Sequence, residues 1–533
     1  MNQLFTNTAT LARLIWRRDR VQIVLWLLSL IIFTIAVAAT FPVLYPEGPE
    51  REIIAQTFTN PALISMLGPA YGIHNYHLGA IMAHQMLLFT MVVVAIMNIL
   101  LTIKHTRRDE ELGRIEVIRS LPVGQLATAS ATMLVLAITN AVLGLAVSLG
   151  LGLLGLTGMD WIGSCFFGGA LSATGLFFAA AALLFAQLTE TSRAALAYSF
   201  GFLGLSFLLR AVGDVGSEPL SLLSPLGLVL RAQVYVRNYF WPLGVVFLGA
   251  VFLTMLAFRL NTRRDLEAGF VPARPGRSHA SPFLSGPLGL VLRLERTTIL
   301  GWTVGMFILG ASYGSIFTDV EDFVHSSELY QQMLPHTAGA SVLDQFVAML
   351  LSVLSMLAAV PALLVILKLR AEERAHRMEH LLARAVTRQK IMGSFLGTAL
   401  VVAVVMQLAG VVGLWASASA VVDDPFALGQ ALQGALVYLP AIWVLVGLAA
   451  LLVGAAPKGA NLAWFYLGYT FFVSYFGSLL QIPAWMSKLT PWGYIPNVPL
   501  EPVRPWTAAA ALVLAAALMA LGLAGYRRRD IYG

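Results

Sequence analysis

Charge is what this chain has least of. Only 11% of its 533 residues are Asp, Glu, Lys or Arg, whereas 58% are hydrophobic and the mean hydropathy is +0.79. A soluble protein of this length carries about twice that charge. The sequence also lacks the alternation of apolar and polar residues that is typical of half-buried strands. These absences exclude a soluble globular protein and predict an all-α polytopic membrane protein.

Long apolar runs are what the sequence has in abundance. A helix needs about 20 apolar residues to cross a bilayer, and twelve runs come near that length. They predict 12 transmembrane helices, at approximately residues 21–42, 82–104, 129–156, 161–187, 194–212, 239–261, 297–317, 344–368, 393–419, 431–456, 460–481 and 506–526.

Cysteine is nearly absent, and so is a cleavage signal. Cys165, the single cysteine, lies inside the fourth apolar run, so no internal disulfide can form. We interpret it as a small buried apolar side chain. The first apolar run follows four arginines, and no small-residue cleavage site closes it, so we expect this span to stay in the protein.

The chain also lacks a phosphate-binding loop. No G-x-x-x-x-G-K-[ST] occurs in it, so ATP could drive the protein only through a separate nucleotide-binding subunit. The spacing of His74, His77 and His84 is not a strong metal-ligand signature. We therefore predict no metal and no cofactor in this chain, and ATP with Mg²⁺ only in a partner. No convincing pair of polar groups suggests a membrane enzyme.

The few charges are distributed unevenly along the chain. If the N-terminus is cytoplasmic and twelve spans alternate, 28 of the 34 Lys and Arg residues face the cytoplasm and 6 lie outside, whereas the acidic residues divide 13 to 14. This is the pattern of the positive-inside rule. We predict that both termini are cytoplasmic, and we interpret the net charge of +7 as a topology signal rather than a nucleic-acid footprint.

No charge lies near the centre of a predicted span. An ion-coupled transporter usually needs such a group, because a charge at the bilayer centre is costly and is kept where function requires it. Asp160, Asp344 and Glu190 are candidates only at span edges, and we interpret them as solvated boundary residues. A 12-helix ion-coupled secondary transporter nevertheless remains the alternative.

The sequence repeats itself once. Six spans in each half would preserve orientation, so the halves are predicted to be parallel repeats. We predict a first six-helix half over residues 1–270, a cytoplasmic linker rich in Pro, Gly, Ser and Arg over 271–287, and a second half over 288–533. The matching segments are 17–26 with 293–302, 107–116 with 370–379, 224–227 with 490–493, and 263–266 with 528–531.

A dense cluster of charge follows the second span of each half. Residues 107–121 predict a short amphipathic surface helix, with Asp109, Glu110 and Glu111 in its first turn and Arg114 spaced i,i+4 from Glu110. Its apolar stripe is Leu112, Ile115 and Ile118. Topology requires only basic residues, so a repeated pattern of both signs indicates a docking surface. The repeated positions are Glu110, Arg114 and Glu116 in the first copy, and Glu373, Arg377 and Glu379 in the second.

Two further segments mix apolar and basic residues just before spans 1 and 7. Residues 13–19 and 289–296 are predicted to lie in the membrane interface as elbow helices.

These features together resemble the type-2-like ABC exporter permeases of the polyketide-antibiotic exporter family, to which tetronasin and multidrug exporters of actinobacteria belong. The resemblance rests on the E-x-x-x-R-x-E helix after the second span of each half, on S/T-P-x-G before the sixth and on R-R-D-[LI] after it. It implies that the repeated helix is a coupling helix. Each copy would contact one protomer of an ATPase dimer, two copies per chain, below a permease in the bacterial cell membrane.

The resemblance also implies a substrate path lined by the second and fifth spans of each half. These spans are rich in aromatic residues and methionine and poor in polar groups, which suits a hydrophobic or amphipathic drug or antibiotic. We therefore expect an exporter of such molecules. The candidate path residues are Gln85, Phe89, Asn98, Tyr198, Met349, Ser352, Asn461, Trp464 and Tyr469.

Overall fold

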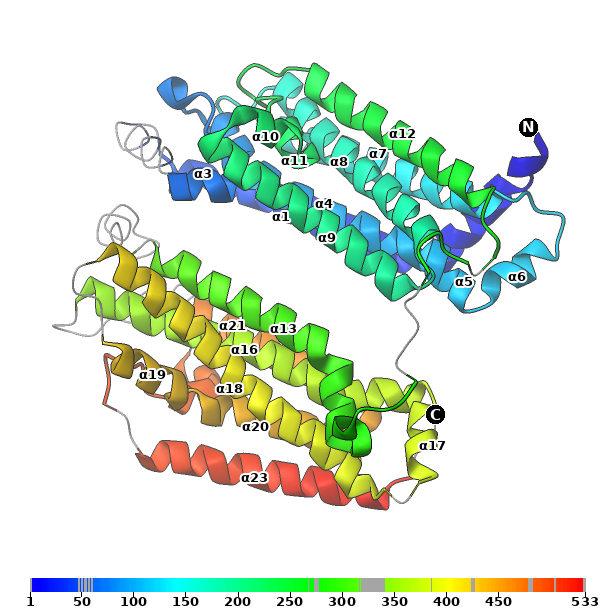
Figure 1. Ribbon diagram of the computed structural model, residues 1–533. Helices are drawn as coiled ribbons and strands as arrows, with labels where there is room; N and C mark the ends of the chain where they lie inside the picture. The colour runs from blue at the N-terminus through cyan, green and yellow to red at the C-terminus, as the bar shows by residue number, and fades with distance from the viewer. Residues whose placement is uncertain are drawn as a thin grey trace. The chain divides into compact units, whose positions relative to one another are not determined.

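The protein is helical throughout the part of the chain that the computed structural model describes (Figure 1). In that part no β-strand occurs, and the only extended pairing is an isolated bridge between Thr189 and Val271. The described residues are 2–46, 48, 51, 55, 58, 61–266, 268–272, 278–315, 317, 341–384, 386–422, 427–477, 483–502 and 505–530.

The chain divides into two compact units, residues 1–276 and 277–533. The division falls inside the segment predicted to be a linker. Each unit has its own large cluster of buried apolar side chains, and we describe each unit by itself.

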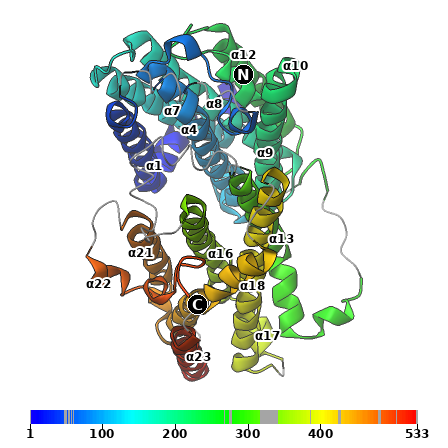
Figure 2. The same ribbon diagram turned by 90° about the vertical axis from the view of Figure 1, so that its left-hand side faces the viewer.

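Unit 1 is built around α8, which contacts α4, α7, α9 and α12 (Figure 2). α1 packs along α7 at the side of the bundle. The long helices are α1 (Thr8–Leu44), α4 (Leu78–Ile103), α7 (Ala127–Leu153), α8 (Trp161–Leu188), α9 (Ser192–Gly216) and α12 (Trp241–Asn261). The short ones are η1 (Asn2–Phe5), α3 (Pro61–Leu67), η2 (Ile73–Asn75), η3 (Lys104–Arg108), α5 (Asp109–Glu111), α6 (Arg114–Arg119), α10 (Glu218–Leu222) and α11 (Pro225–Leu230).

Unit 2 has its most extensive contacts between α13 and α18 and between α20 and α23. α16 packs against both α18 and α20. The long helices are α13 (Pro287–Gly314), α16 (Val342–Arg374), α18 (Arg388–Val421), α19 (Leu428–Val437), α20 (Leu439–Ala455), α21 (Leu462–Phe476) and α23 (Pro505–Arg528). The short ones are η4 (Pro282–Ser285), α17 (Arg377–Leu382), η6 (Pro457–Gly459), α22 (Ala484–Ser487) and η7 (Pro491–Tyr494).

Ten of the described helices are long and apolar enough to cross a membrane, which confirms the prediction of an all-α polytopic membrane protein. Helices also occupy the two other predicted spans. α21 has 15 described residues, about 22 Å of helix, which is less than the ~30 Å hydrocarbon core. α13 carries three charged residues in its first half and many small or polar ones after them.

Small residues allow the long helices to approach closely. Gly144 of α7 faces Gly168 of α8, and a Cβ built on Gly168 would lie 2.2 Å from the carbonyl oxygen of Gly144. In unit 2, a Cβ on Gly310 of α13 would lie 1.9 Å from the carbonyl oxygen of Gly410 of α18. Helices in a bilayer associate by packing rather than by the hydrophobic effect, so such close contacts contribute much of the cohesion.

Two sequence interpretations need correction. The predicted elbow segments are not separate helices, because 13–19 lies within α1 and 289–296 lies within α13. No proline interrupts either helix at these positions, so each continues unbroken into the following apolar run. Cys165 is exposed on α8 rather than buried.

We expect Gly168→Ala to lower the free energy of unfolding by about 1–3 kcal/mol, because its methyl group would push α7 and α8 apart. The measurement is thermal unfolding of the detergent-purified chain. Gly201→Ala on α9 is the matched control, since a Cβ there meets no atom within 4 Å. Equal stability of the two variants would contradict the role given to this contact.

Candidate functional site

The charged segment after α4 begins as a continuation of that helix. The helix continues from α4 through η3, a π-helical turn, into α5. It ends after α5 because Gly113 takes a left-handed conformation with φ of 68°. Glycine adopts this conformation without steric cost, which makes it a common helix terminator. A new short helix, α6, starts at Arg114. The structure therefore has two short helices where the sequence predicted one helix over 107–121.

Unit 2 repeats this arrangement. α16 continues to Arg374, His376 takes a left-handed conformation with φ of 57°, and α17 follows from Arg377. Histidine is sterically less suited to this conformation than glycine. Its imidazole contacts Glu379 at 2.8 Å, in the first turn of α17. We call the end of each unit that carries these short helices its charged end.

Glu110 is buried at the charged end of unit 1. Arg264, which follows α12, donates to both of its carboxylate oxygens at 2.8 Å, and Arg107 lies 3.0 Å away. Both arginines also donate to the carbonyl of Ala268. A buried carboxylate is tolerated only when it is paired in this way. Glu110 thus ties the end of α4 to the segment after α12.

Glu373 is held in the same way in unit 2. Arg529, at the end of the last helix, donates to both of its oxygens at 2.7 Å, and Arg370 lies 4.0 Å away. Arg264 and Arg529 occupy equivalent positions in the two R-R-D segments that the sequence repeats. We call the Glu110–Arg264 and Glu373–Arg529 pairs the clamps.

The predicted pair of Glu110 with Arg114 does not form. Arg114 instead bonds to Asp109 at 2.8 Å, because the break at Gly113 removes the i,i+4 register of a continuous helix. Arg377 likewise pairs with Glu372 at 2.7 Å. Each arginine at the start of the new helix is therefore tied back to the end of the preceding one.

Of the six predicted docking residues, Glu116 and Glu379 are exposed carboxylates. The side chain of Glu379 is 69% exposed. Ile115 and Met378 anchor α6 and α17 to their units. The predicted apolar stripe is only partly correct, because Leu112 is exposed at the helix break. Glu110 and Glu373, by contrast, are buried by their clamps.

A small cavity lies behind α6. Side chains of α6, α7, α8 and α12 line it, with Arg119 and Gln187 among them, and it encloses about 20 Å³. That volume suits about one water molecule. Burial lowers the pKa of Arg119 from its ordinary value, nearby Arg264 lowers it further, and Glu110 partly offsets both. The cavity is too small for a drug-sized substrate.

Three polar residues predicted to line the path make internal hydrogen bonds. Asn98 and Asn140 exchange side-chain bonds of 3.0 and 2.7 Å between α4 and α7. Gln85 bonds to the hydroxyl of Tyr45. Tyr469 donates to the carbonyl of Met486 at 3.0 Å.

The other candidate path residues differ in exposure. Phe89 on α4 and Tyr198 on α9 are exposed, and Tyr198 stacks on Phe185. Asn461 is exposed at the start of α21. Met349, Ser352 and Trp464 are partly buried within unit 2.

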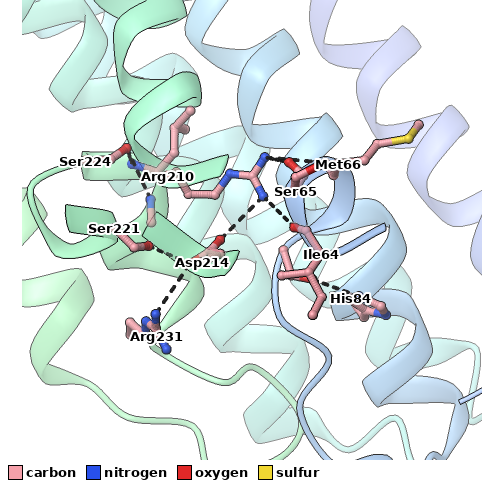
Figure 3. A network of polar contacts seen from close by, with 12 residues as sticks. Ile64, Ser65, Met66, His84, Arg210, Asp214, Ser221, Ser224 and Arg231 are labelled. Carbon is pink, nitrogen blue, oxygen red and sulfur yellow. Dashed lines mark hydrogen bonds and ion pairs between the residues drawn. The ribbon is translucent and has the colours of Figure 1, made fainter. Parts of the chain in front are cut away.

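A second polar cluster lies at the opposite end of unit 1 (Figure 3). Arg210 lies inside α9 and is fully buried. Its guanidinium donates to the carbonyls of Ile64 at 3.3 Å and Ser65 at 2.6 Å, at the C-terminal end of α3. A cation at this end of a helix complements the helix dipole. Asp214, one turn on, lies 3.4 Å from Arg210.

Asp214 connects this cluster to the neighbouring short helices. It accepts a hydrogen bond of 2.6 Å from Ser221 of α10, and Arg231 lies 3.4 Å away. Arg231 also donates to Tyr71, and burial raises the pKa of Tyr71 to about 12. Sequence reasoning missed the cluster, although the i,i+4 spacing of Arg210 and Asp214 in an apolar helix was a signal for it.

The repeated S/T-P-x-G motif is a helix N-cap. The Ser224 hydroxyl accepts from the amides of Leu226 and Gly227 at the start of α11. The Thr490 hydroxyl accepts from the amide of Gly493 at the start of η7. The motif therefore recurs for a local structural reason, since the hydroxyl satisfies amides that a helix leaves unpaired at its start.

Two of the three histidines named in the sequence analysis, His77 and His84, have structural partners. His77 caps α4 through the amide of Ala80, and burial lowers the pKa of His77 from its ordinary value. His84 contacts the hydroxyl of Tyr76 through Nδ1 and the carbonyl of Gly68 through Nε2. His74 lies in η2.

The comparisons with known proteins agree on one family. A family model described as the C-terminal domain of the multidrug efflux system permease Rv1217c matches residues 284–527. Over 536 aligned residues, the chain is 37% identical to the multidrug efflux system permease protein Rv1217c of Mycobacterium tuberculosis, covering 99% of this chain and 96% of that protein. The chain belongs to this family of multidrug efflux permeases.

Family membership covers both units of the permease. The matched C-terminal domain extends from η4 through most of α23, and the full-length relative aligns with nearly the whole chain. Both charged ends thus lie within the region of similarity.

For the clamp of unit 1, we expect Glu110→Gln to lower the free energy of unfolding by about 3–5 kcal/mol, because the two arginines around it would lose their buried counter-charge. Chemical unfolding in detergent, followed by tryptophan fluorescence, measures this. Glu116→Gln removes an exposed carboxylate six residues away and serves as the control, with an expected change within about 0.5 kcal/mol. A Glu110→Gln variant as stable as this control would refute the clamp.

Proposed function

We propose that this permease is the transmembrane subunit of an ATP-driven exporter that moves hydrophobic or amphipathic drugs out of the cell. A separate nucleotide-binding ATPase dimer would dock on α6 and α17. One observation carries the proposal: the charged end of each unit carries a short helix, and the two helices share a sequence pattern. The same type of clamp holds the segment before each helix. Each helix presents one exposed carboxylate, Glu116 or Glu379. Two equivalent surfaces suit a partner with two equivalent protomers.

The clamps give each docking helix a mechanical connection. α6 follows α5, whose Glu110 is bonded to Arg264 beyond α12, and α17 follows the end of α16, whose Glu373 is bonded to Arg529 beyond α23. A movement imposed on either short helix would therefore reach two long helices. In this reading the buried glutamates transmit motion, while the exposed ones contact the ATPase.

For the topology, we propose twelve spans in two parallel six-helix repeats, with α13 and α21 completing the second. Corresponding predicted spans pack together in each unit: α1 with α7 and α8 with α12 in unit 1, and α13 with α18 and α20 with α23 in unit 2. The positive-inside rule then places both charged ends and both termini on the cytoplasmic side of the bacterial plasma membrane. This chain would have no enzymatic activity, and ATP and Mg²⁺ would bind to the ATPase.

The ion-coupled alternative requires an acidic group within the membrane. Asp160 caps α8 and Asp344 lies in the first turn of α16, so both are at helix ends. Asp214 is the buried acid that best fits the alternative. It lies, however, 3.4 Å from both Arg210 and Arg231, and nearby positive charges favour the ionised carboxylate over the protonated form that a proton carrier must also adopt.

The partner is tested directly by gentle affinity purification of the tagged chain from its native membrane. We expect a stoichiometric ATPase, two copies per chain, identified by mass spectrometry. Reversal of the exposed acids, Glu116→Lys with Glu379→Lys, should leave the protein inserted but remove the ATPase and abolish ATP-coupled transport, because like charges would then meet at both docks.

Glu501→Lys is the matched control, since it reverses an exposed acid far from either charged end in sequence. It should retain the ATPase. If the wild-type chain purified alone and was monodisperse, the ion-coupled alternative would gain support. If transport survived the double reversal, α6 and α17 would not be the docking helices.

For the substrate path, we expect Phe89→Ala and Tyr198→Ala to raise the apparent KM for an exported hydrophobic dye about 10-fold, the cost of losing one buried aromatic contact of about 1.4 kcal/mol. ATP-driven uptake of the dye into inverted vesicles measures this. Phe240→Ala, which truncates an exposed aromatic just before α12, is the control. An unchanged KM in both path variants would remove these residues from the path.

A further inference from the structure

One carboxylate at the charged end of unit 1 connects to the helix that we expect to line the path. Glu111 is the last residue of α5. One of its oxygens accepts a hydrogen bond of 2.7 Å from the backbone amide of Ser192, and the other accepts from the Ser192 hydroxyl. Ser192 is the first residue of α9. Glu111 therefore joins the segment that carries α6 directly to the N-terminus of α9.

The Glu111–Ser192 contact links α9 to α5, but α9 does not need this contact in order to form. The first amides of a helix have no partner within the helix and carry partial positive charge, so a carboxylate is favourable there. α9 already has its own cap, because the Thr191 hydroxyl accepts from the amide of Ala194. Removing the Glu111 carboxylate would leave that cap in place and would break only the connection to α5.

Among the described residues of unit 2, no equivalent connection occurs. The repeat aligns Glu111 with Arg374, which is exposed and cannot accept a hydrogen bond. The described part of unit 2 shows no carboxylate bonded to the start of α21, and its N-cap residue, Asn461, makes no capping bond there.

Unit 1 has a further connection at this point. Arg18 of α1 lies 2.7 Å from Asp109, and Asp19 beside it accepts from Lys104 at 2.8 Å. The repeat places Leu294 where Arg18 stands. The segment before α6 is thus bonded to α1, to α9 and to the residues after α12. In the described part of unit 2, the corresponding segment retains only the last of these bonds between elements.

We propose that Glu111 makes α6, rather than α17, the docking helix that transmits movement of the ATPase to the helix lining the path. Movement of α6 would be transmitted through the Glu111–Ser192 contact to α9, whereas α17 would hold the second ATPase protomer without a matching link to α21. Glu111 is then a positioning residue that touches neither substrate nor nucleotide. The proposal rests on the proposed function, because it assigns unequal roles to the two docks.

Hydrogen exchange of the assembled permease–ATPase complex tests this without a known substrate. The probe is a non-hydrolysable ATP analogue, and the readout is amide exchange at the start of α9, residues 192–198, and at the start of α21, residues 462–468. In the wild type, we expect the analogue to change exchange at α9 and not at α21. Glu111→Gln should remove that response and raise basal exchange at α9 about 10-fold, the factor expected for one lost charge-assisted hydrogen bond.

Arg374→Gln is the matched control at the repeated position and should leave both segments as in the wild type. Glu111→Asp shortens the carboxylate while keeping its charge, so it should lose the response as well, and it serves if Gln impairs folding. The proposal is overturned if Glu111→Gln keeps the response, or if Arg374→Gln abolishes it equally. Absence of the ATPase from the wild-type preparation would overturn the proposed function, and this inference with it.

Discussion

A buried carboxylate held by an arginine from the end of the last long helix is the constraint on which each charged end depends. Glu110 and Glu373 leave water only because Arg264 and Arg529 neutralise them, and a buried charge without such a partner would be strongly destabilising. The pairs also fix where α4 and α16 end relative to the terminal segments of their units. The positions of α6 and α17 follow from this, so the geometry of both proposed docks rests on two ion pairs.

The two ends of unit 1 use buried charge differently. At the charged end, acids and bases bridge segments that are far apart in sequence, which suits the transmission of movement. At the opposite end, Arg210 saturates the carbonyls of α3 while Asp214 holds α10 and Arg231. That cluster holds short helices against the bundle. In unit 2 the helix that corresponds to α9 is α21, and its described part contains no charged residue. The halves therefore share their clamps but differ in how the opposite end is built.

Much of the fold could be predicted from the sequence, because long apolar runs leave a chain few alternatives to membrane helices. The locations of the long helices and of the two charged segments that follow α4 and α16 were found in this way. The helix break at Gly113 was missed, although glycine after a charged turn is a recognisable stop signal. The clamps could not be predicted, because Glu110 and Arg264 are 154 residues apart, and a pattern of local spacing contains no record of such a contact. The repeated R-R-D segment was the one available hint.

The repeat preserves pairs of residues rather than single ones, and this changes how its motif should be interpreted. Asp109 with Arg114 becomes Glu372 with Arg377, and the longer acid still reaches its arginine. Glu110 with Arg264 becomes Glu373 with Arg529. Most of the E-x-x-x-R-x-E pattern is therefore satisfied within each unit. Its last glutamate stays exposed in both copies, so the motif combines an internal scaffold with a single position suited to a partner. The recurrence of the motif in both halves could not tell scaffold positions from the position suited to a partner. The burial and pairing of each side chain distinguish the two.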